Sequence, residues 1–327
     1  MNRISLEDAL QECRKANSFL VTTHADPDGD AVGSALAVMH FLRALGKTEV
    51  VCTCHDPVPR IYDWMPGAVE IIEPDAIEGT FDLVVIIDVA QRERIGSVAE
   101  VLGDDQRILV LDHHREDKPC GTVNFVEPTY AAASEIVVDL FEAAGVAMSE
   151  DAATCAYVGL TTDTGSFRFG NTDARAHRHA IALLEAGIDA AAISARVFDV
   201  MSLPKSALLE RVLQRIQVSD CARYAWSWVN ADDLVHVDAT SEDMDGLVNY
   251  VRNIEGIEVG LLFRELEKDR TKVSVRSQGQ VSSSEILKPL GGGGHAGAAG
   301  ATLHTGLDEA RPQVLARVAE ALGAIAS

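Results

Sequence analysis

Acidic residues and histidines gather in four short motifs of the chain, and three of these end an apolar segment. Carboxylates and imidazoles in such numbers either move protons or bind metal ions. In a parallel sheet, groups that follow the strands meet at one edge, where ligands bind. The four motifs are His24-x-Asp26-x-Asp28-x-Asp30, Asp88, Asp112-His113-His114 and Asp163.

The carboxylates of these motifs would repel one another if they met without a cation. Two carboxylates about 4 Å apart repel by about 4 kcal/mol at an effective dielectric of about 20. The motifs contain no lysine or arginine, so divalent cations are the expected partners. Carboxylates with fewer imidazoles and no thiolate favour Mn²⁺, with Mg²⁺ or Co²⁺ as alternatives. More than four ligands indicate two ions, a pair that clamps phosphoryl oxygens and activates water.

Each motif taken singly has an ordinary structural explanation. An Asp-x-Asp pair often forms a turn or caps a helix, and Asp88 could cap the next helix. Asp163 could be a polar helix end, and paired histidines occur on many surfaces. Their joint occurrence at the ends of successive apolar segments favours a metal site.

The elements that must position these groups are predicted from the periodicity of apolar residues. Apolar segments, some continuous, predict strands buried on both faces of a parallel sheet. Amphipathic segments between and after them predict helices, so the fold class is a doubly wound, mainly parallel α/β domain. The strands are expected over 18–23, 49–55, 69–73, 81–88 and 107–112, and the helices over 31–45, 131–144 and 150–160.

The remainder of the chain predicts a smaller α/β domain after a helical connection. Residues 172–217 are helical in pattern, and later segments alternate between the two periodicities. We expect a metal-binding catalytic domain over 1–190, a helical linker over 191–205 and a second domain over 206–327. In the second domain we expect strands over 223–229, 259–267 and 271–276, and helices over 241–254, 282–290 and from 307.

Composition excludes several classes of protein. The 327 residues carry 50 acidic and 28 basic side chains, a net charge of −22, which disfavours binding to long duplex nucleic acid. The six cysteines form no CxxC pair, and we interpret Cys52-x-Cys54-His55 as core rather than a zinc site. No apolar segment approaches the ~20 residues of a membrane span. A soluble cytoplasmic protein is therefore expected.

Together the motifs resemble a known family, the DHH phosphoesterases. The resemblance rests on His24, Asp28 and Asp30 in H-x-x-x-D-x-D, on Asp88 and Asp163, and on the Asp112-His113-His114 triplet. The segment 292–300, which begins Gly-Gly-Gly-His, resembles the glycine-rich signature of the DHH-associated substrate domain. Within this family the chain is most similar to the compact bacterial nano-RNases that also dephosphorylate 3′-phosphoadenosine-5′-phosphate (pAp).

The resemblance implies a role for each motif residue. His24 and Asp28 would bind one Mn²⁺, Asp30, His113 and Asp163 the other, and Asp88 would bridge them. His114 would face the substrate phosphate as a general acid or charge stabiliser, or support the structure behind the ligands. Asp88 and His114 are thus the predicted catalytic residues, Asp112 would orient an imidazole, and Asp26 would lie outside the ligand set.

Substrate contacts are expected from the second domain, across a cleft between the domains. Glycines allow backbone N–H groups to approach an anion, so Gly293, Gly294 and His295 are predicted to bind the substrate. Arg276, at a strand end, is predicted to grip a phosphate. Lys268 and Arg270 are interpreted as a solvated turn.

The expected activity is Mn²⁺-dependent hydrolysis of short oligoribonucleotides, of pAp, or of both. Alternatives are a phosphodiesterase for cyclic or linear di-AMP, a manganese inorganic pyrophosphatase, and a nucleotide-binding regulator without activity. The sequence leaves open the substrate length, the polarity of attack, the physiological metal and whether the chain forms a homodimer.

Overall fold

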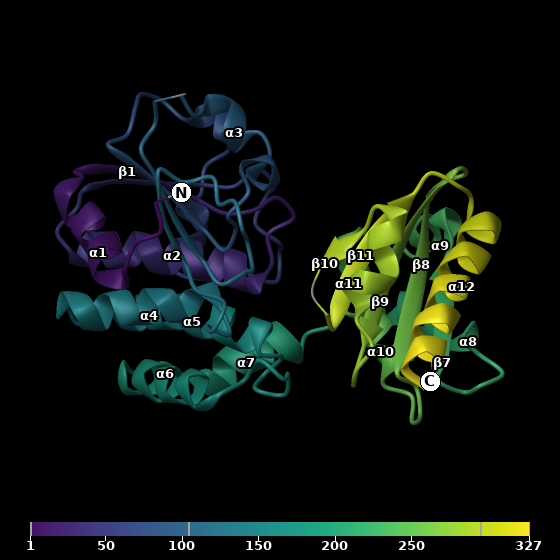
Figure 1. The fold of residues 1–327 in the computed structure, drawn as a ribbon. Coiled ribbons are helices and arrows are strands. Elements are labelled where there is room, and N and C mark those ends of the chain that lie inside the picture. Colours follow the sequence, from purple (N-terminus) through teal and green to yellow (C-terminus); the bar gives the residue numbers. More distant parts are fainter. Residues whose placement is uncertain (1, 104, 295, 327) are drawn as a thin grey trace. The chain divides into compact units, whose positions relative to one another are not determined.

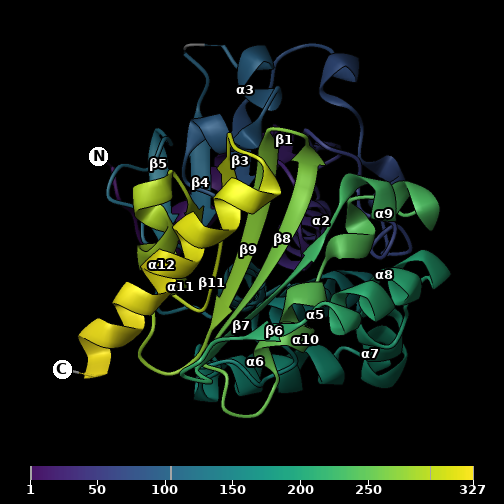
Figure 2. The same ribbon diagram turned by 90° about the vertical axis from the view of Figure 1, so that its right-hand side faces the viewer.

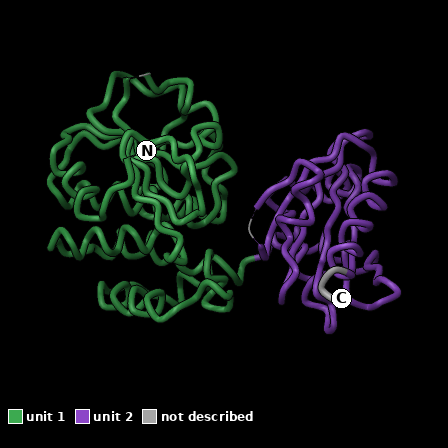
Figure 3. Tube along the Cα trace, in the orientation of Figure 1, with its two compact units in different colours: residues 1–200 green, residues 201–327 purple. Residues whose placement is uncertain are grey.

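The computed structural model describes residues 2–103, 105–294 and 296–326, and it divides the chain into two compact units (Figures 1 and 3). The first unit covers Met1–Val200 and the second Met201–Ser327. The division falls between α7 (Ala190–Phe198) and α8 (Leu203–Gln214).

The first unit contains a five-stranded sheet in which every strand is parallel to its neighbours. Its strand order is β2-β1-β3-β4-β5, so the order reverses between β1 and β3. Such a reversal opens a crevice at the carboxyl ends of the two strands. This confirms the predicted parallel sheet. The strands are β1 (Ser18–Thr22), β2 (Glu49–Thr53), β3 (Leu83–Ile87), β4 (Ile108–Asp112) and β5 (Val123–Val126).

Helices cover this sheet and form its hydrophobic core. The five residues of β3 are all buried, as expected for a strand covered on both faces. α2 lies against α5, where a Cβ added at Gly33 would come within 2.6 Å of the Cys155 carbonyl oxygen. The helices are α1 (Leu6–Lys15), α2 (Gly29–Ala44), α3 (Val98–Val101), α4 (Ala133–Ala144), α5 (Glu150–Asp163), α6 (Ala174–Glu185) and α7.

The second unit is a smaller α/β domain with a mixed sheet of order β10-β11-β9-β8-β7-β6 (Figure 2). Among the strands of the described residues in this sheet, β7 and β8 pair in parallel and the other neighbours pair antiparallel. Helices α11 and α12 cover one face, and α8 and α10 pack on the other. The elements are β6 (Gln217–Val218), β7 (Tyr224–Val229), α9 (Ala231–His236), α10 (Leu247–Arg252), β8 (Val259–Glu267), β9 (Arg270–Ser277), α11 (Ser283–Leu287), β10 (Gly293–Gly294), β11 (Ala298–Leu303) and α12 (Leu307–Ala326).

Three local expectations are wrong. Residues 69–73 form a 3₁₀ turn, Ala68–Glu70, and a single bridge from Ile72 to Thr53 rather than a strand. The helix expected over 241–254 is interrupted at Gly246, whose φ of 75° is left-handed. The helix over 282–290 is likewise split, since α11 gives way to the 3₁₀ turn Lys288–Leu290.

None of the helices in the described part of the chain has the length and apolar character needed to cross a lipid bilayer.

Candidate metal centre

The structure brings the four motifs together at the carboxyl edge of the parallel sheet. His24 and Asp88 follow β1 and β3, His113 follows β4, Asp28 and Asp30 begin α2, and Asp163 ends α5. Potential ligand atoms lie within 4.8 Å of one another in three groups. These groups are His24, Asp28 and Asp88; Asp30, His113 and Asp163; and Asp88, His113 and His114.

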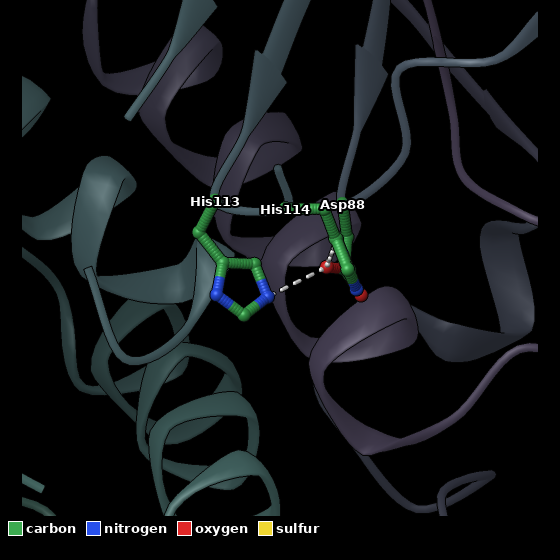
Figure 4. Close-up of side chains that lie close together, drawn as sticks. All are labelled: Asp88, His113 and His114. Atoms are coloured by element: carbon green, nitrogen blue, oxygen red, sulfur yellow. Dashed lines mark ion pairs between the residues drawn. The ribbon is translucent and has the colours of Figure 1, made fainter. Parts of the chain in front are cut away.

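Asp88 lies at the centre of this arrangement and belongs to two of the three groups, one with His24 and Asp28 and the other with His113 and His114. Its Oδ1 is 3.3 Å from His113 Nε2 (Figure 4). Its Oδ2 is 3.6 Å from His24 Nε2. The residue is 2% exposed, and Oδ1 has no hydrogen-bond partner among the residues that the structure describes. Its φ of 64° is in the left-handed region, a strain that folds retain at functional sites. The carboxylate is therefore buried, strained and incompletely satisfied.

Backbone carbonyls orient the two histidines of the set. Nδ1 of His24 lies 2.8 Å from the Ala25 oxygen, and Nδ1 of His113 lies 3.3 Å from the Tyr130 oxygen. A carbonyl only accepts, so each Nδ1 carries a proton and each Nε2 is directed at the carboxylates. Nε2 of His113 is buried without a hydrogen-bond partner. This is the arrangement by which proteins hold metal-binding imidazoles.

Helix N-termini hold two of the carboxylates. Asp28 caps α2 and accepts hydrogen bonds from the backbone N–H groups of Asp30 and Ala31 at 3.1 and 3.0 Å. Asp30 is fully buried and accepts from the N–H groups of Ala133 and Ser134 at 2.5 and 3.0 Å, at the start of α4. The positive end of each helix favours the ionised carboxylate.

Crowding of the carboxylates opposes their ionisation. Burial, followed by the charge of Asp88, raises the pKa of Asp28 and raises that of Asp30 to about 7. Burial and the charge of Asp30 raise the pKa of Asp163 well above its usual range. Only histidines form ion pairs with these four carboxylates in the described part of the chain.

The same crowding favours the charged form of the His24 imidazole. Burial disfavours a charged His24, but the Asp88 carboxylate outweighs burial and raises the pKa of His24 to about 9. Burial by itself would raise the pKa of Asp88, but His113 and His24 hold this pKa well below its usual range. Protons thus occupy part of the place that divalent cations would take, and metal binding would release them.

The donor set fits a pair of divalent cations. Four carboxylates and two imidazoles, with no thiolate, suit Mn²⁺, Mg²⁺ or Co²⁺. The unpartnered Asp88 Oδ1 and His113 Nε2 lie where such ions would bind. All six predicted ligands lie within these groups. Asp88 belongs to the group of His24 and Asp28, and its Oδ1 lies 3.3 Å from Nε2 of His113, a member of the group of Asp30 and Asp163.

His114 adjoins this centre without belonging to either predicted ligand set. Its Nδ1 lies 2.8 Å from Asp112 Oδ1 and 3.6 Å from Asp88 Oδ1, and its side chain is 23% exposed (Figure 4). Asp112 therefore orients an imidazole, as expected. Asp26 contributes to none of the three ligand groups.

The predicted substrate residues belong to the second unit. Arg276 is half-buried on β9, and burial, opposed by the nearby Asp245, lowers the pKa of its guanidinium. Gly293 and Gly294 are exposed and form β10, paired with Gly300 and Ala299, so part of the expected binding loop is a strand. His295 lies outside the described residues.

Sequence reasoning missed a buried cluster behind the centre. Glu135 on α4 is fully buried, and its Oε1 lies 2.8 Å from Nδ1 of His179 on α6. Nε2 of His179 lies 2.9 Å from Asp139 Oδ1, and Asp139 Oδ2 accepts from the Tyr130 hydroxyl at 2.5 Å. The signal available in the sequence was an acid, Glu135, inside the apolar helical segment 131–144.

Two family models match the chain. The "DHH family, N-terminal domain" matches residues 18–160, and the "DHHA1 domain" matches residues 223–324. These segments contain, respectively, the metal-centre residues except Asp163 and the predicted substrate residues.

Whole-length comparisons agree with the two family models. The chain is 35% identical to a bifunctional oligoribonuclease and PAP phosphatase of Thermus thermophilus, over 92% of this chain and 89% of that protein. It is 26% identical to the protein of the same description in Bacillus subtilis, over 88% and 90%. A crystal structure of an exopolyphosphatase-related protein from Bacteroides fragilis shares the fold, with a TM-score of 0.90, 24% identity and coverage of 96% and 95%.

The His179 cluster predicts a pH dependence of stability. Burial opposes its protonation, but Asp139 and Glu135 raise the folded-state pKa of His179 to about 9, above the value of about 6.5 for an unperturbed histidine. Protonation therefore stabilises the fold fully below about pH 6.5, and this contribution is lost as pH rises through about 9. We expect His179→Gln to remove on the order of 2 kcal/mol of unfolding free energy at pH 6 and much less at pH 10.

Urea denaturation of the unsubstituted chain and the His179→Gln variant, from pH 6 to 10, measures this difference. An equal loss of stability at every pH would show that the charge of His179 contributes nothing.

Proposed function

Because this chain belongs to the DHH family and is a hydrolase of ester bonds, we propose that it hydrolyses short oligoribonucleotides, pAp or both in a Mn²⁺-dependent reaction. The observation that carries the proposal is the convergence of six carboxylate and imidazole groups at the carboxyl edge of the sheet, where Asp88 lies beside both His24 and His113. The two relatives described above are named for these two activities.

We assign the residues to two metal ions as follows. His24 and Asp28 would hold one ion, and Asp30, His113 and Asp163 would hold the other. Asp88, which lies beside His24 and His113, would contact both ions. When bound, such a pair lowers the pKa of water and neutralises charge on phosphoryl oxygens. The strained backbone of Asp88 and the helix ends at Asp28 and Asp30 fix these carboxylates before substrate arrives.

His114 is the proposed residue that faces the substrate phosphate. Asp112 holds its Nδ1 at 2.8 Å and so fixes the orientation of the ring. With 23% of its side chain exposed, the ring is accessible to substrate while the ligands beside it are buried. His114 then donates a proton to the leaving oxygen or stabilises charge on the phosphate.

The second unit is proposed to hold a terminal phosphate of the substrate. Lys272 and Arg276 are four residues apart on β9, so their side chains lie on the same face of the sheet. Lys272 also pairs in register with Arg264 of β8, and the three cationic side chains therefore share this face. The Nε atoms of Arg252 and Arg264 are buried and have no hydrogen-bond partners within the described part of the chain. The positive charge of Arg252 repels that of Arg276 and lowers its pKa, while the negative charge of Asp245 raises it. In a chain of net charge −22, this cluster favours a phosphate ligand.

The charge of the whole chain bears on substrate length. A net charge of −22 disfavours long polyanions, whose affinity depends on extended arrays of lysine and arginine. A short nucleotide needs only one local cationic site, so di- to pentanucleotides and pAp are the proposed substrates.

Asp88→Ala tests the proposed reaction. We expect it to reduce turnover by about 10³-fold or more, because several kcal/mol of transition-state stabilisation depend on the paired ions. The assay follows Mn²⁺-dependent hydrolysis of a dinucleotide, pAp, cyclic di-AMP and pyrophosphate in parallel.

Asp26→Asn is the matched control for this variant, since Asp26 lies in the same motif as Asp28 but in none of the ligand groups. It should retain the rate of the unsubstituted chain. Retained hydrolysis by Asp88→Ala would refute the mechanism, and preference for pyrophosphate or cyclic di-AMP would refute the proposed substrate.

Arg276→Ala tests the proposed phosphate contact. We expect KM for a 5′-phosphorylated dinucleotide to rise about 10- to 100-fold, since a charge-assisted contact contributes about 1.5–3 kcal/mol. Arg270→Ala is the control, because Arg270 is exposed and pairs with Glu267 at 3.0 Å. Equal KM values for the two variants would exclude Arg276 from binding.

A further inference from the structure

The buried cluster of Glu135, Asp139, His179 and Tyr130 joins α6 to the segment that precedes α4. His179 lies between two carboxylates, Glu135 Oε1 at 2.8 Å and Asp139 Oδ1 at 2.9 Å, and its side chain is 9% exposed. Glu135 Oε2 accepts from the Ala131 N–H at 2.5 Å, and Asp139 accepts from the Tyr130 hydroxyl. His179 is therefore connected to Tyr130 through Asp139 and to Ala131 through Glu135.

This same segment contacts two of the proposed metal ligands. The Tyr130 carbonyl accepts from His113 Nδ1 at 3.3 Å. Three residues further on, the Ala133 and Ser134 N–H groups donate to the two carboxylate oxygens of Asp30. A shift of this segment would therefore move the imidazole and the carboxylate of one ligand group together.

Asn171, just before α6, connects the segment to the third ligand of that group. Its Nδ2 donates to the Ala131 carbonyl and to the Asp163 carbonyl, both at 3.0 Å. Asp30, His113 and Asp163 are thus all tied to residues 130–134, directly or through Asn171. The other group is held differently, with His24 on the Ala25 carbonyl and Asp28 on the first N–H groups of α2.

We propose that His179 and Asn171 are positioning residues for one of the two metal subsites, that of Asp30, His113 and Asp163. They keep residues 130–134 in the place from which the Tyr130 carbonyl and the Ala133 and Ser134 amides orient the ligands. This proposal rests on the proposed metal centre. Because only one subsite depends on this segment, loss of His179 or Asn171 weakens the binding of one metal ion and not of the other.

The expected magnitude follows from the behaviour of groups that orient metal ligands. Loss of such a group costs about 10- to 100-fold in metal affinity, because the ligands then sample non-binding orientations. His179→Gln removes the positive charge of the imidazole and one of its two side-chain contacts, either that to Glu135 or that to Asp139. Alanine at 171 removes both amide hydrogen bonds, at an exposed position where the substitution is tolerated by the fold.

Titration of the metal-free full-length chain with Mn²⁺ tests the proposal, with unbound Mn²⁺ quantified by its EPR signal. The variants are His179→Gln and Asn171→Ala, and the control is His40→Gln. His40 lies on α2 and its Nε2 contacts the Pro66 carbonyl at 3.1 Å, away from the ligand groups. Circular dichroism checks that each variant is folded.

We expect the unsubstituted chain and the His40→Gln variant each to bind two Mn²⁺ ions, with the same affinities in both proteins. In His179→Gln and Asn171→Ala, one of the two sites should weaken about 10- to 100-fold while the other is unchanged, and excess Mn²⁺ should restore turnover. Unaltered binding of both ions, or equal weakening of both, in a folded variant would overturn the inference. If the unsubstituted chain bound no Mn²⁺, the proposed metal centre itself would be wrong. Asn171→Ala decides the matter if His179→Gln does not fold.

Discussion

Electrostatic repulsion among crowded carboxylates is the constraint on which this structure depends. Asp28, Asp30, Asp88 and Asp163 meet at one edge of a sheet, and within the described chain their ion pairs are to histidines alone. Helix ends and shared protons relieve part of the repulsion, as the raised pKa of Asp30 shows. Only cations would neutralise the remaining negative charge, so the repulsion among the carboxylates favours the binding of metal ions.

The fold places this site where a parallel sheet has space for it. The strand order reverses between β1 and β3, and His24 and Asp88 follow these two strands. β4 adds His113, while α2 and α5 add three carboxylates from helix ends. Ligands that come from five elements are held rigidly only if the core that joins those elements is rigid. The close approach of α2 and α5 at Gly33 is one such contact.

Much of this could be predicted because it is local. Continuous apolar strands such as β3 predicted the parallel sheet, and acids at their ends predicted the shared edge. Other features depend on context that one sequence does not display. Residues 69–73 look like a strand but form a 3₁₀ turn, and β5 is too short and polar at Asn124 to stand out. The contact between Glu135 and His179 joins residues 44 positions apart, so no spacing rule reveals it.

Anomalous diffraction from crystals grown with Mn²⁺, recorded on both sides of the manganese absorption edge, would show whether two ions bind at this edge of the sheet. We expect two anomalous peaks about 3.5–4 Å apart, with the Asp88 carboxylate in contact with both. One peak would lie beside His24 and Asp28 and the other beside Asp30, His113 and Asp163. Peaks elsewhere in the molecule, or none at these six side chains, would contradict it.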